Sequence, residues 1–154
     1  MYKHSPCIFC ILSLFCALCV VASCDKMPIN GDLDGMWQLE RVETSETILD
    51  TRTHRVYLSI QLHLAQWDDP TEGLTLYSHF RHEGDSLFFI DLSHASPHTA
   101  TASDDTLVTS QEMADGLMKA WGIYDIHTRY CIRTLKTQNL QLEKADTIYY
   151  YKKF

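Results

Sequence analysis

Apolar and polar residues alternate along much of the chain, and this period of two constrains the fold more than any other feature of the sequence. In the clearest stretch, residues 56–65, one face would carry Val56, Leu58, Ile60, Leu62 and Leu64. Successive side chains of a β-strand point to opposite faces of the sheet. The pattern therefore predicts a half-buried strand of an antiparallel sheet.

Similar segments predict further strands on both sides of this one. We expect them over residues 37–43, 74–81, 87–92, 129–135, 140–142 and 147–153. Clusters of turn-forming residues separate them, at 68–73, 83–85 and 144–146. This spacing predicts a mainly β fold, an antiparallel meander barrel of about eight strands, with a sandwich as the alternative.

One short helix is expected to interrupt the strands. Thr109 and Glu112 have the spacing of a capping box, and apolar residues follow at helical spacing up to Trp121. Gly122 would end this helix. The small polar residues over 94–105 predict an exposed loop.

The first 23 residues have the features of a bacterial lipoprotein signal peptide. Lys3 precedes an apolar run over residues 7–21, and small residues then lead into Cys24. A positive start, an apolar stretch of about 7–15 residues and small residues before the cleavage point are typical of a secretory signal. We expect cleavage before Cys24 and acylation of its thiol by a diacylglycerol with palmitate-type chains.

This interpretation divides the chain into three regions and predicts its location. Residues 1–23 would be the signal peptide, residues 24–33 a lipidated tether and residues 34–154 the folded domain. The protein would be anchored by lipid in the bacterial cell envelope, at the outer membrane, on a face that the sequence leaves open. The alternatives are an ordinary signal peptide and an uncleaved membrane helix, which would need about 20 apolar residues.

The mature chain would be acidic and would lack an internal disulfide. Without Lys3, 12 Lys and Arg residues stand against 20 Asp and Glu residues, a net charge of −8. The absence of any basic run disfavours a nucleic-acid partner. Four of the six cysteines lie in the expected signal peptide, so the mature chain would keep two, the acylated Cys24 and Cys131. We interpret Cys131 as a small buried apolar residue rather than a nucleophile.

The start of the expected domain carries a family motif. Gly35-Met36-Trp37 resembles the Gly-x-Trp opening of the lipocalins. The resemblance implies a lipocalin-like barrel over the whole mature chain, in which Gly35 turns the chain into the barrel and Trp37 plugs its closed end. It also implies an envelope lipoprotein of the kind common in gut anaerobes, most of them domains of unknown function. A cation from the last strand that packs on the tryptophan would be Lys152 or Lys153.

No motif predicts catalysis, a cofactor or a metal. His79 and His82 would lie on opposite faces of a strand, and Pro97 separates His94 from His98 within a loop. We interpret the histidines as surface groups, with a site assembled from distant strands as the alternative. Nucleophile-elbow, phosphate-loop, zinc-helix and dinucleotide motifs are absent from the sequence. We therefore expect a protein that is not an enzyme.

The inner face of the expected barrel is the candidate binding site. One serine interrupts the apolar residues predicted to line it, which are Leu58, Ile60, Leu62, Leu64, Leu76, Ser78, Phe80, Phe88 and Ile90. A barrel of about eight strands either fills itself with side chains or holds one small ligand, and we expect a small apolar ligand. The alternative is a filled barrel whose exterior, with Tyr57, Tyr77, Tyr149 and Tyr151, binds an envelope protein or a glycan.

Overall fold

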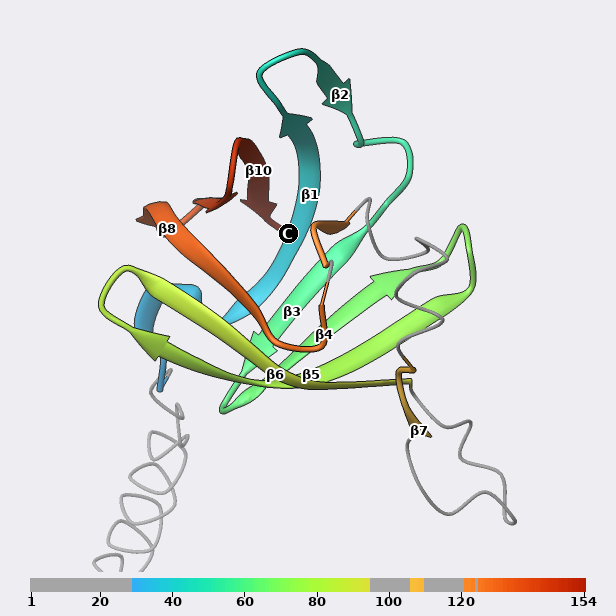
Figure 1. Cartoon of the computed structure of the whole chain (residues 1–154). Coiled ribbons are helices and arrows are strands. Elements are labelled where there is room, and N and C mark those ends of the chain that lie inside the picture. The colour runs from blue at the N-terminus through green and yellow to red at the C-terminus, as the bar shows by residue number, and fades with distance from the viewer. Residues whose placement is uncertain (1–28, 95–105, 110–120, 124) are drawn as a thin grey trace, which may run out of the picture.

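The computed structural model describes residues 29–94, 106–109, 121–123 and 125–154. Over these residues the chain forms ten strands and one 3-10 helix (Figure 1). The elements are η1 (Gly31–Leu33), β1 (Gly35–Glu43), β2 (Ile48–Asp50), β3 (Tyr57–Gln61), β4 (Leu64–Asp69), β5 (Leu74–Glu83), β6 (Ser86–His94), β7 (Thr106–Leu107), β8 (Thr128–Lys136), β9 (Asn139–Lys144) and β10 (Thr147–Lys153).

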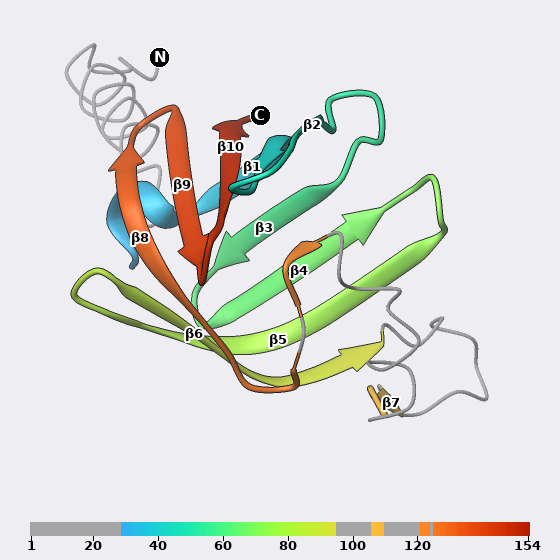
Figure 2. The same ribbon diagram turned by 45° about the horizontal axis from the view of Figure 1, so that its top comes forward.

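The sheet closes into an antiparallel barrel. The strands β1, β3, β4, β5, β6, β8, β9 and β10 are hydrogen-bonded neighbours in this order, and β10 pairs with β1 (Figure 2). The short strand β2 pairs with the far end of β1, and β7 pairs with the end of β6. Closure confirms the predicted meander barrel over the sandwich, because each of these eight strands has a partner on both sides.

Two of the predicted tight turns join neighbouring strands. Gly84-Asp85 connects β5 to β6, and Ala145-Asp146 connects β9 to β10. Gly84 and Ala145 have φ angles of 61° and 54°. Positive φ is what the two-residue turns of twisted hairpins require, so local chemistry at these turns agrees with the barrel topology.

A third two-residue turn overturns the single strand predicted over residues 56–65. The chain reverses at Leu62-His63, where Leu62 has a φ angle of 58°, so that β3 and β4 form a hairpin with Gln61 opposite Leu64. Neither residue of the turn is a usual turn former. The alternation of apolar and polar residues therefore continues through the turn, and nothing in the local sequence marks the hairpin.

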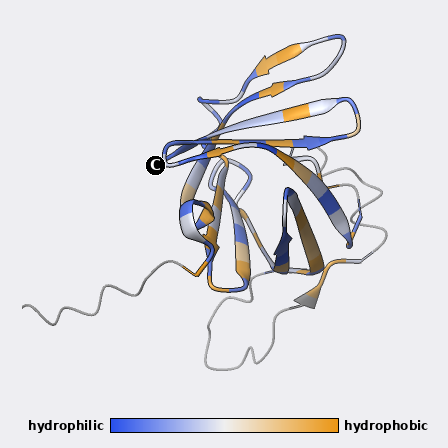
Figure 3. Cartoon of the chain, turned by 90° about the vertical axis from the view of Figure 1, so that its left-hand side faces the viewer, coloured by the Kyte–Doolittle hydropathy of each residue, from blue (hydrophilic) through white to orange (hydrophobic). Residues whose placement is uncertain are grey.

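The barrel is filled by one hydrophobic core. Hydrophobic and hydrophilic segments alternate along the strands in Figure 3, as expected for a sheet with one face buried. The largest fully buried side chains include Trp37, Trp67 and Tyr149. Ile123 and Trp121, which follow one another closely between β7 and β8, are also buried in this core.

The folded part of the chain begins before the expected domain boundary at residue 34. Leu33, which the sequence predicted as the last residue of the tether, is completely buried. The Asn30 side-chain amide donates to the carbonyl of Leu62 at 2.7 Å and to a carboxylate oxygen of Asp34 at 2.5 Å. Residues from Asn30 onward thus belong to the barrel.

Four predictions concern residues that the structure does not describe. The expected helix falls mostly on residues 110–120, and the expected loop falls mostly on residues 95–105. The same holds for the signal peptide and for Cys24. Among the described residues, none of the helices has the length and apolarity that a membrane span requires.

Candidate binding sites of the barrel

Five of the nine residues predicted to line the barrel interior do point inward. Leu58 and Ile60 on β3, and Leu76, Ser78 and Phe80 on β5, are all at most 3 % exposed. Each strand contributes alternate residues, as the period of two predicts. Leu58, Ile60, Leu76 and Phe80 belong to the packed core, and Phe80 also borders a cleft at one end of the barrel.

The other four predicted lining residues do not point into the barrel, and the positions of the hairpin turns explain why. In a two-residue hairpin the residues flanking the turn are paired and share a face, so inward positions change between even and odd residue numbers across the turn. Leu62 lies in a turn and Leu64 is exposed beside Gln61. On β6 the same reversal buries Leu87 and Phe89 and leaves Phe88 and Ile90 only partly buried on the other face.

Ser78 is buried, but its hydroxyl is used by the backbone. The pairing of β5 and β6 shifts here, and Asp91 opposite has a φ angle of 51°. The Ser78 hydroxyl accepts a hydrogen bond from the Ile90 amide at 3.0 Å and lies 2.5 Å from the Ile90 carbonyl. The serine thus completes a β-bulge, where the strand ladder is locally interrupted.

Aromatic rings in mutual contact fill the middle of the interior. The ring centroids are 4.6 Å apart for Trp67 and Phe89, 5.7 Å for Phe89 and Tyr130, and 5.8 Å for Tyr130 and Tyr149, all in edge-to-face geometry. This geometry is favourable for aromatic pairs. The Tyr130 hydroxyl donates to the Gly122 carbonyl at 2.5 Å, which ties the segment before β8 to this row of rings.

The lipocalin-type motif forms the closed end of the barrel, which we define as the end with η1 and the turns Leu62-His63 and Gly84-Asp85. Trp37 is fully buried, and its indole N–H donates to the Leu33 carbonyl at 2.8 Å. The Lys153 ammonium lies 4.7 Å from the Trp37 ring centroid and donates to the Asp32 carbonyl at 3.0 Å. Lys153 therefore provides the cation on the tryptophan, a cation–π contact.

Gly35 makes this contact sterically feasible. Its φ angle is 129°, and a Cβ atom at this position would lie 2.7 Å from Cε of Lys153. A residue without a side chain is needed both for this backbone conformation and for the close approach of the lysine.

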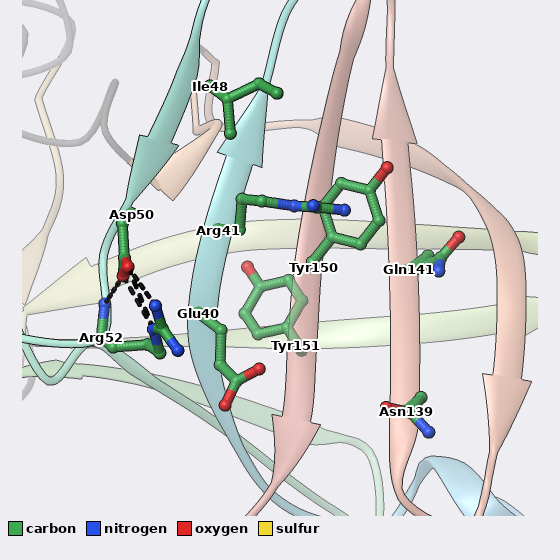
Figure 4. Close-up of a pocket in the computed structure, with 9 residues that line it drawn as sticks. All are labelled: Glu40, Arg41, Ile48, Asp50, Arg52, Asn139, Gln141, Tyr150 and Tyr151. Atoms are coloured by element: carbon green, nitrogen blue, oxygen red, sulfur yellow. Dashed lines mark hydrogen bonds and ion pairs between the residues drawn. The ribbon is translucent and has the colours of Figure 1, made fainter.

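A polar groove of about 360 Å³ lies on the outer face of β1, β10 and β9, beside β2 (Figure 4). The residues lining it are Glu40, Arg41, Ile48, Asp50, Arg52, Asn139, Gln141, Tyr150 and Tyr151. A bulge in β1 at Glu40 shifts the register, so that Leu39 pairs with Tyr151 and Arg41 pairs with Tyr150. This shift places Arg41 beside the outward ring of Tyr150.

Arg41 is the most unusual side chain of the groove. Its guanidinium carbon lies 3.8 Å from the centroid of the Tyr150 ring, and its Nη2 lies 3.5 Å from Oε2 of Glu43. Among the side chains that the structure describes, its Nε is the buried nitrogen or oxygen atom that lacks a hydrogen-bond partner. A buried donor without an acceptor is costly, and Arg41 is one of the residues that line the groove.

The groove carries no net charge but contains both signs. Arg52 donates from Nε to both carboxylate oxygens of Asp50, at 3.0 and 3.1 Å. These hydrogen bonds lower the pKa of Asp50 to about 2. Arg41 and Glu40 supply the second pair of opposite charges on the lining. Asn139 and Gln141 add amide groups that both donate and accept hydrogen bonds.

The tyrosines expected on the exterior divide between the two faces. Tyr149 and Tyr151 are buried, because the Ala145-Asp146 turn pairs them with the inward residues Leu142 and Leu140 of β9. Burial raises the pKa of Tyr151 well above its usual range. Tyr150, between them, is the outward residue, and the count from the turn is the signal that identifies it.

The described histidines and Cys131 do not form a shared site. No group of three or more His, Cys, Asp or Glu residues with the geometry of a metal site occurs among the residues that the structure describes. His79 is paired with Asp91, with 3.1 Å between Nδ1 and Oδ2, on the exposed side of the bulge. Cys131 is half-buried on β8 with a free thiol.

Comparison with known proteins identifies the same fold. The family model described as a lipocalin-like domain matches residues 17–154. A lipocalin-like protein from Bacteroides uniformis has a similar structure, with a TM-score of 0.57 and 19% identity, over 80% of this chain and 100% of that one. An uncharacterised protein from Bacteroides eggerthii gives a TM-score of 0.52 and 13% identity, over 79% and 98% of the two chains.

A protein from Burkholderia xenovorans is also similar, with a TM-score of 0.50 and 11% identity, over 79% of this chain and 82% of that one. No curated protein has detectable similarity to the chain. At these identities the solved structures are evidence for the fold alone, whereas the family model extends over most of the chain. The chain belongs to the family of lipocalin-like domains.

Proposed function

We propose that the mature chain is a lipid-anchored protein of the bacterial cell envelope that binds a glycan in the outer groove of its barrel. The barrel itself acts as a rigid scaffold. The single observation that carries this proposal is Arg41, which lines the groove, stacks on Tyr150 and has a buried Nε without a hydrogen-bond partner. Buried polar groups are nearly always paired, so a donor left free at a groove favours a ligand that accepts its hydrogen bond.

The mixed chemistry of the groove favours a neutral, hydroxyl-rich ligand. Glu40 and Asp50 accept hydrogen bonds, Arg41 and Arg52 donate them, and the amides of the β9 residues do both. Sugar hydroxyls also donate and accept, and they need no net charge on the protein. The volume of about 360 Å³ is within the range of small-molecule sites.

The packed interior of the barrel supports a glycan in the outer groove rather than a small apolar ligand inside the barrel. The row of rings from Trp67 to Tyr149 lies in the packed core, and each of these rings is at most 3 % exposed. An apolar ligand of drug size would require a pocket of about 300–1,000 Å³ and the displacement of these side chains.

The lipid anchor rests on Cys24 and predicts a simple result. Replacing Cys24 by alanine removes the thiol that would be acylated, so we expect the protein to move from the membrane fraction to the soluble fraction. Fractionation with immunoblotting and mass spectrometry of the N-terminus measure both changes. Cys131→Ala is the matched control and leaves the protein in the membrane fraction. Continued membrane retention of the Cys24 variant would instead indicate an uncleaved helix.

Arg41→Gln tests the groove. The substitution removes a charged donor, and hydrogen bonds to charged groups contribute about 1.5–3 kcal/mol, so we expect glycan affinity to fall about 10- to 100-fold. The probes are neutral malto-, xylo- and manno-hexaose and oligomers of N-acetylglucosamine, measured by calorimetric titration. Arg133→Gln is the matched control, since Arg133 pairs with Glu143 outside the groove, and we expect it to leave affinity unchanged.

A second titration, with a fluorescent fatty acid, distinguishes a glycan in the outer groove from an apolar ligand in the barrel interior. If the wild-type protein binds none of the oligosaccharides but takes up a fluorescent fatty acid at one molecule per chain, the glycan proposal is wrong and the barrel interior is the site. Equal loss of glycan affinity in both arginine variants would also contradict a site at Arg41.

A further inference from the structure

Exposed apolar side chains gather at the closed end of the barrel. Among the described residues eight large apolar side chains are exposed, and five of them belong to the segments of this end or lie next to them: Ile29, Met36, Leu62, Leu64 and Phe154. The amide of Phe154 donates to the Met36 carbonyl at 2.8 Å, which keeps these two together at the edge of β1. Apolar groups concentrated on one part of a surface indicate an interaction with another apolar body.

The chain enters the barrel at the same end. Hydrogen bonds fix Asn30 to the Leu62 carbonyl, so the entry segment lies against the Leu62-His63 turn. A cleft of about 430 Å³ lies here, lined by Ile29, Asn30, His63, Phe80, Arg81, His82 and Glu83. His63 and His82 offer hydrogen-bond donors next to the apolar side chains, while Arg81 is paired with Glu83 at 3.1 Å. Polar and apolar groups occur together in this way where a protein meets a bilayer and its headgroups.

The length of chain between the expected acylation site and the barrel is short. Four residues lie between Cys24 and Ile29, so the five steps along the chain span at most about 18 Å at 3.3–3.6 Å per residue. A ten-residue strand such as β5 is about 33 Å long. A lipid on Cys24 therefore keeps the closed end near the bilayer, whereas the β1–β2 hairpin extends from a different part of the barrel (Figure 1).

We propose that the closed end is a membrane-contact surface, in which Ile29 and Leu62 enter the headgroup region of the bilayer that holds the acylated Cys24. This inference rests on the lipid anchor proposed above and adds an orientation. The groove runs along the side of the barrel, and its end beside β2, at Ile48 and Asp50, then lies away from the bilayer, where a glycan has access. The apolar contacts also supplement the lipid, since each buried methylene group contributes to membrane binding.

Fluorescent labels at two matched leucines test the orientation. Leu62 is 51 % exposed at the closed end, and Leu49 is 53 % exposed on β2. Each is replaced by cysteine in the Cys131→Ser background and labelled with the polarity-sensitive dye NBD. The acylated protein is then reconstituted in vesicles of phosphatidylethanolamine and phosphatidylglycerol, with or without lipids that carry a spin label near the headgroup.

We expect the label at residue 62 to shift its emission to shorter wavelength and to be quenched at least threefold more strongly than the label at residue 49. Circular dichroism verifies that both labelled proteins are folded. Equal quenching, or stronger quenching at residue 49, in a protein that is acylated and bound to the vesicles would overturn the orientation while the anchor stands. A wild-type protein that is neither acylated nor bound would overturn the anchor, and the orientation with it.

Discussion

Replacing Trp37 by alanine is expected to lower the free energy of unfolding of the barrel domain by about 3–5 kcal/mol, the usual cost of removing a buried tryptophan. The Trp37 side chain is fully buried at the closed end, so its removal opens a cavity in the core. It also leaves the Leu33 carbonyl without the indole N–H that donates to it at 2.8 Å. Chemical denaturation, monitored by circular dichroism, measures the change.

Two variants separate the contributions of this tryptophan. Trp37→Phe retains an aromatic ring but removes the N–H donor, so we expect a smaller loss of about 1–3 kcal/mol. Lys153→Met retains most of the aliphatic stem beside Gly35 and removes the ammonium above the ring, a loss of about 0.5–1 kcal/mol. If Trp37→Ala costs less than either of these variants, Trp37 does not close the barrel as we describe.

Replacing Gly122 by alanine is expected to cost about 2–5 kcal/mol. Its φ angle is 79°, and a Cβ atom there would lie 2.4 Å from Cζ of Tyr149 and 2.9 Å from the hydroxyl oxygen of Tyr130. The left-handed conformation costs an alanine about 1–2 kcal/mol, and overpacking of a core adds about 1–3 kcal/mol. Both rings belong to the packed row, which leaves them little room to move.

Gly73→Ala is the matched control for this prediction. Gly73 has a similar φ angle of 64°, but a Cβ atom there would have no neighbour within 4 Å. We therefore expect only the conformational cost of about 1–2 kcal/mol. Equal destabilisation by the two substitutions, measured as the difference in denaturation midpoint at constant slope, would contradict the steric role of Gly122.

The strands and most of their turns were predictable because their signals are local. Alternation identified β1, β3, β5, β6, β8, β9 and β10, but it joined the start of β4 to β3 and missed the short β2 and β7. The turn at Gly84-Asp85 was visible as a glycine between polar residues. The motif of Gly35 and Trp37 also indicated the family correctly. In each case the information lies within a few consecutive residues.

The faces of the strands were less predictable because they depend on where a hairpin turns. Leu62 and Leu64 continue the apolar pattern of β3, but the turn at Leu62-His63 has no glycine, asparagine or proline to reveal it. One unrecognised turn moves every later inward position by one residue. The same parity explains why Phe89, rather than Phe88, joins the row of rings in the core.

The outer groove was missed because it is made by strand pairing at a distance. Arg41 and Tyr150 are separated by more than a hundred residues, and they meet because the barrel closes between β1 and β10 with a bulge at Glu40. Neither the closure nor the bulge has a signature in the local sequence. A tyrosine run at the end of the chain was visible, and the ring that points outward follows only from counting residues from the Ala145-Asp146 turn.

The mainly β character, the meander order, the Gly35–Trp37 end and the acidic composition of this protein follow from the sequence alone, because backbone propensity, periodicity and charge act through neighbouring residues. Only the tertiary structure decided which side chains fill the barrel, which cation covers Trp37 and where a polar groove forms. Those features follow from register and closure, in which one hydrogen-bond ladder joins the first strand to the last.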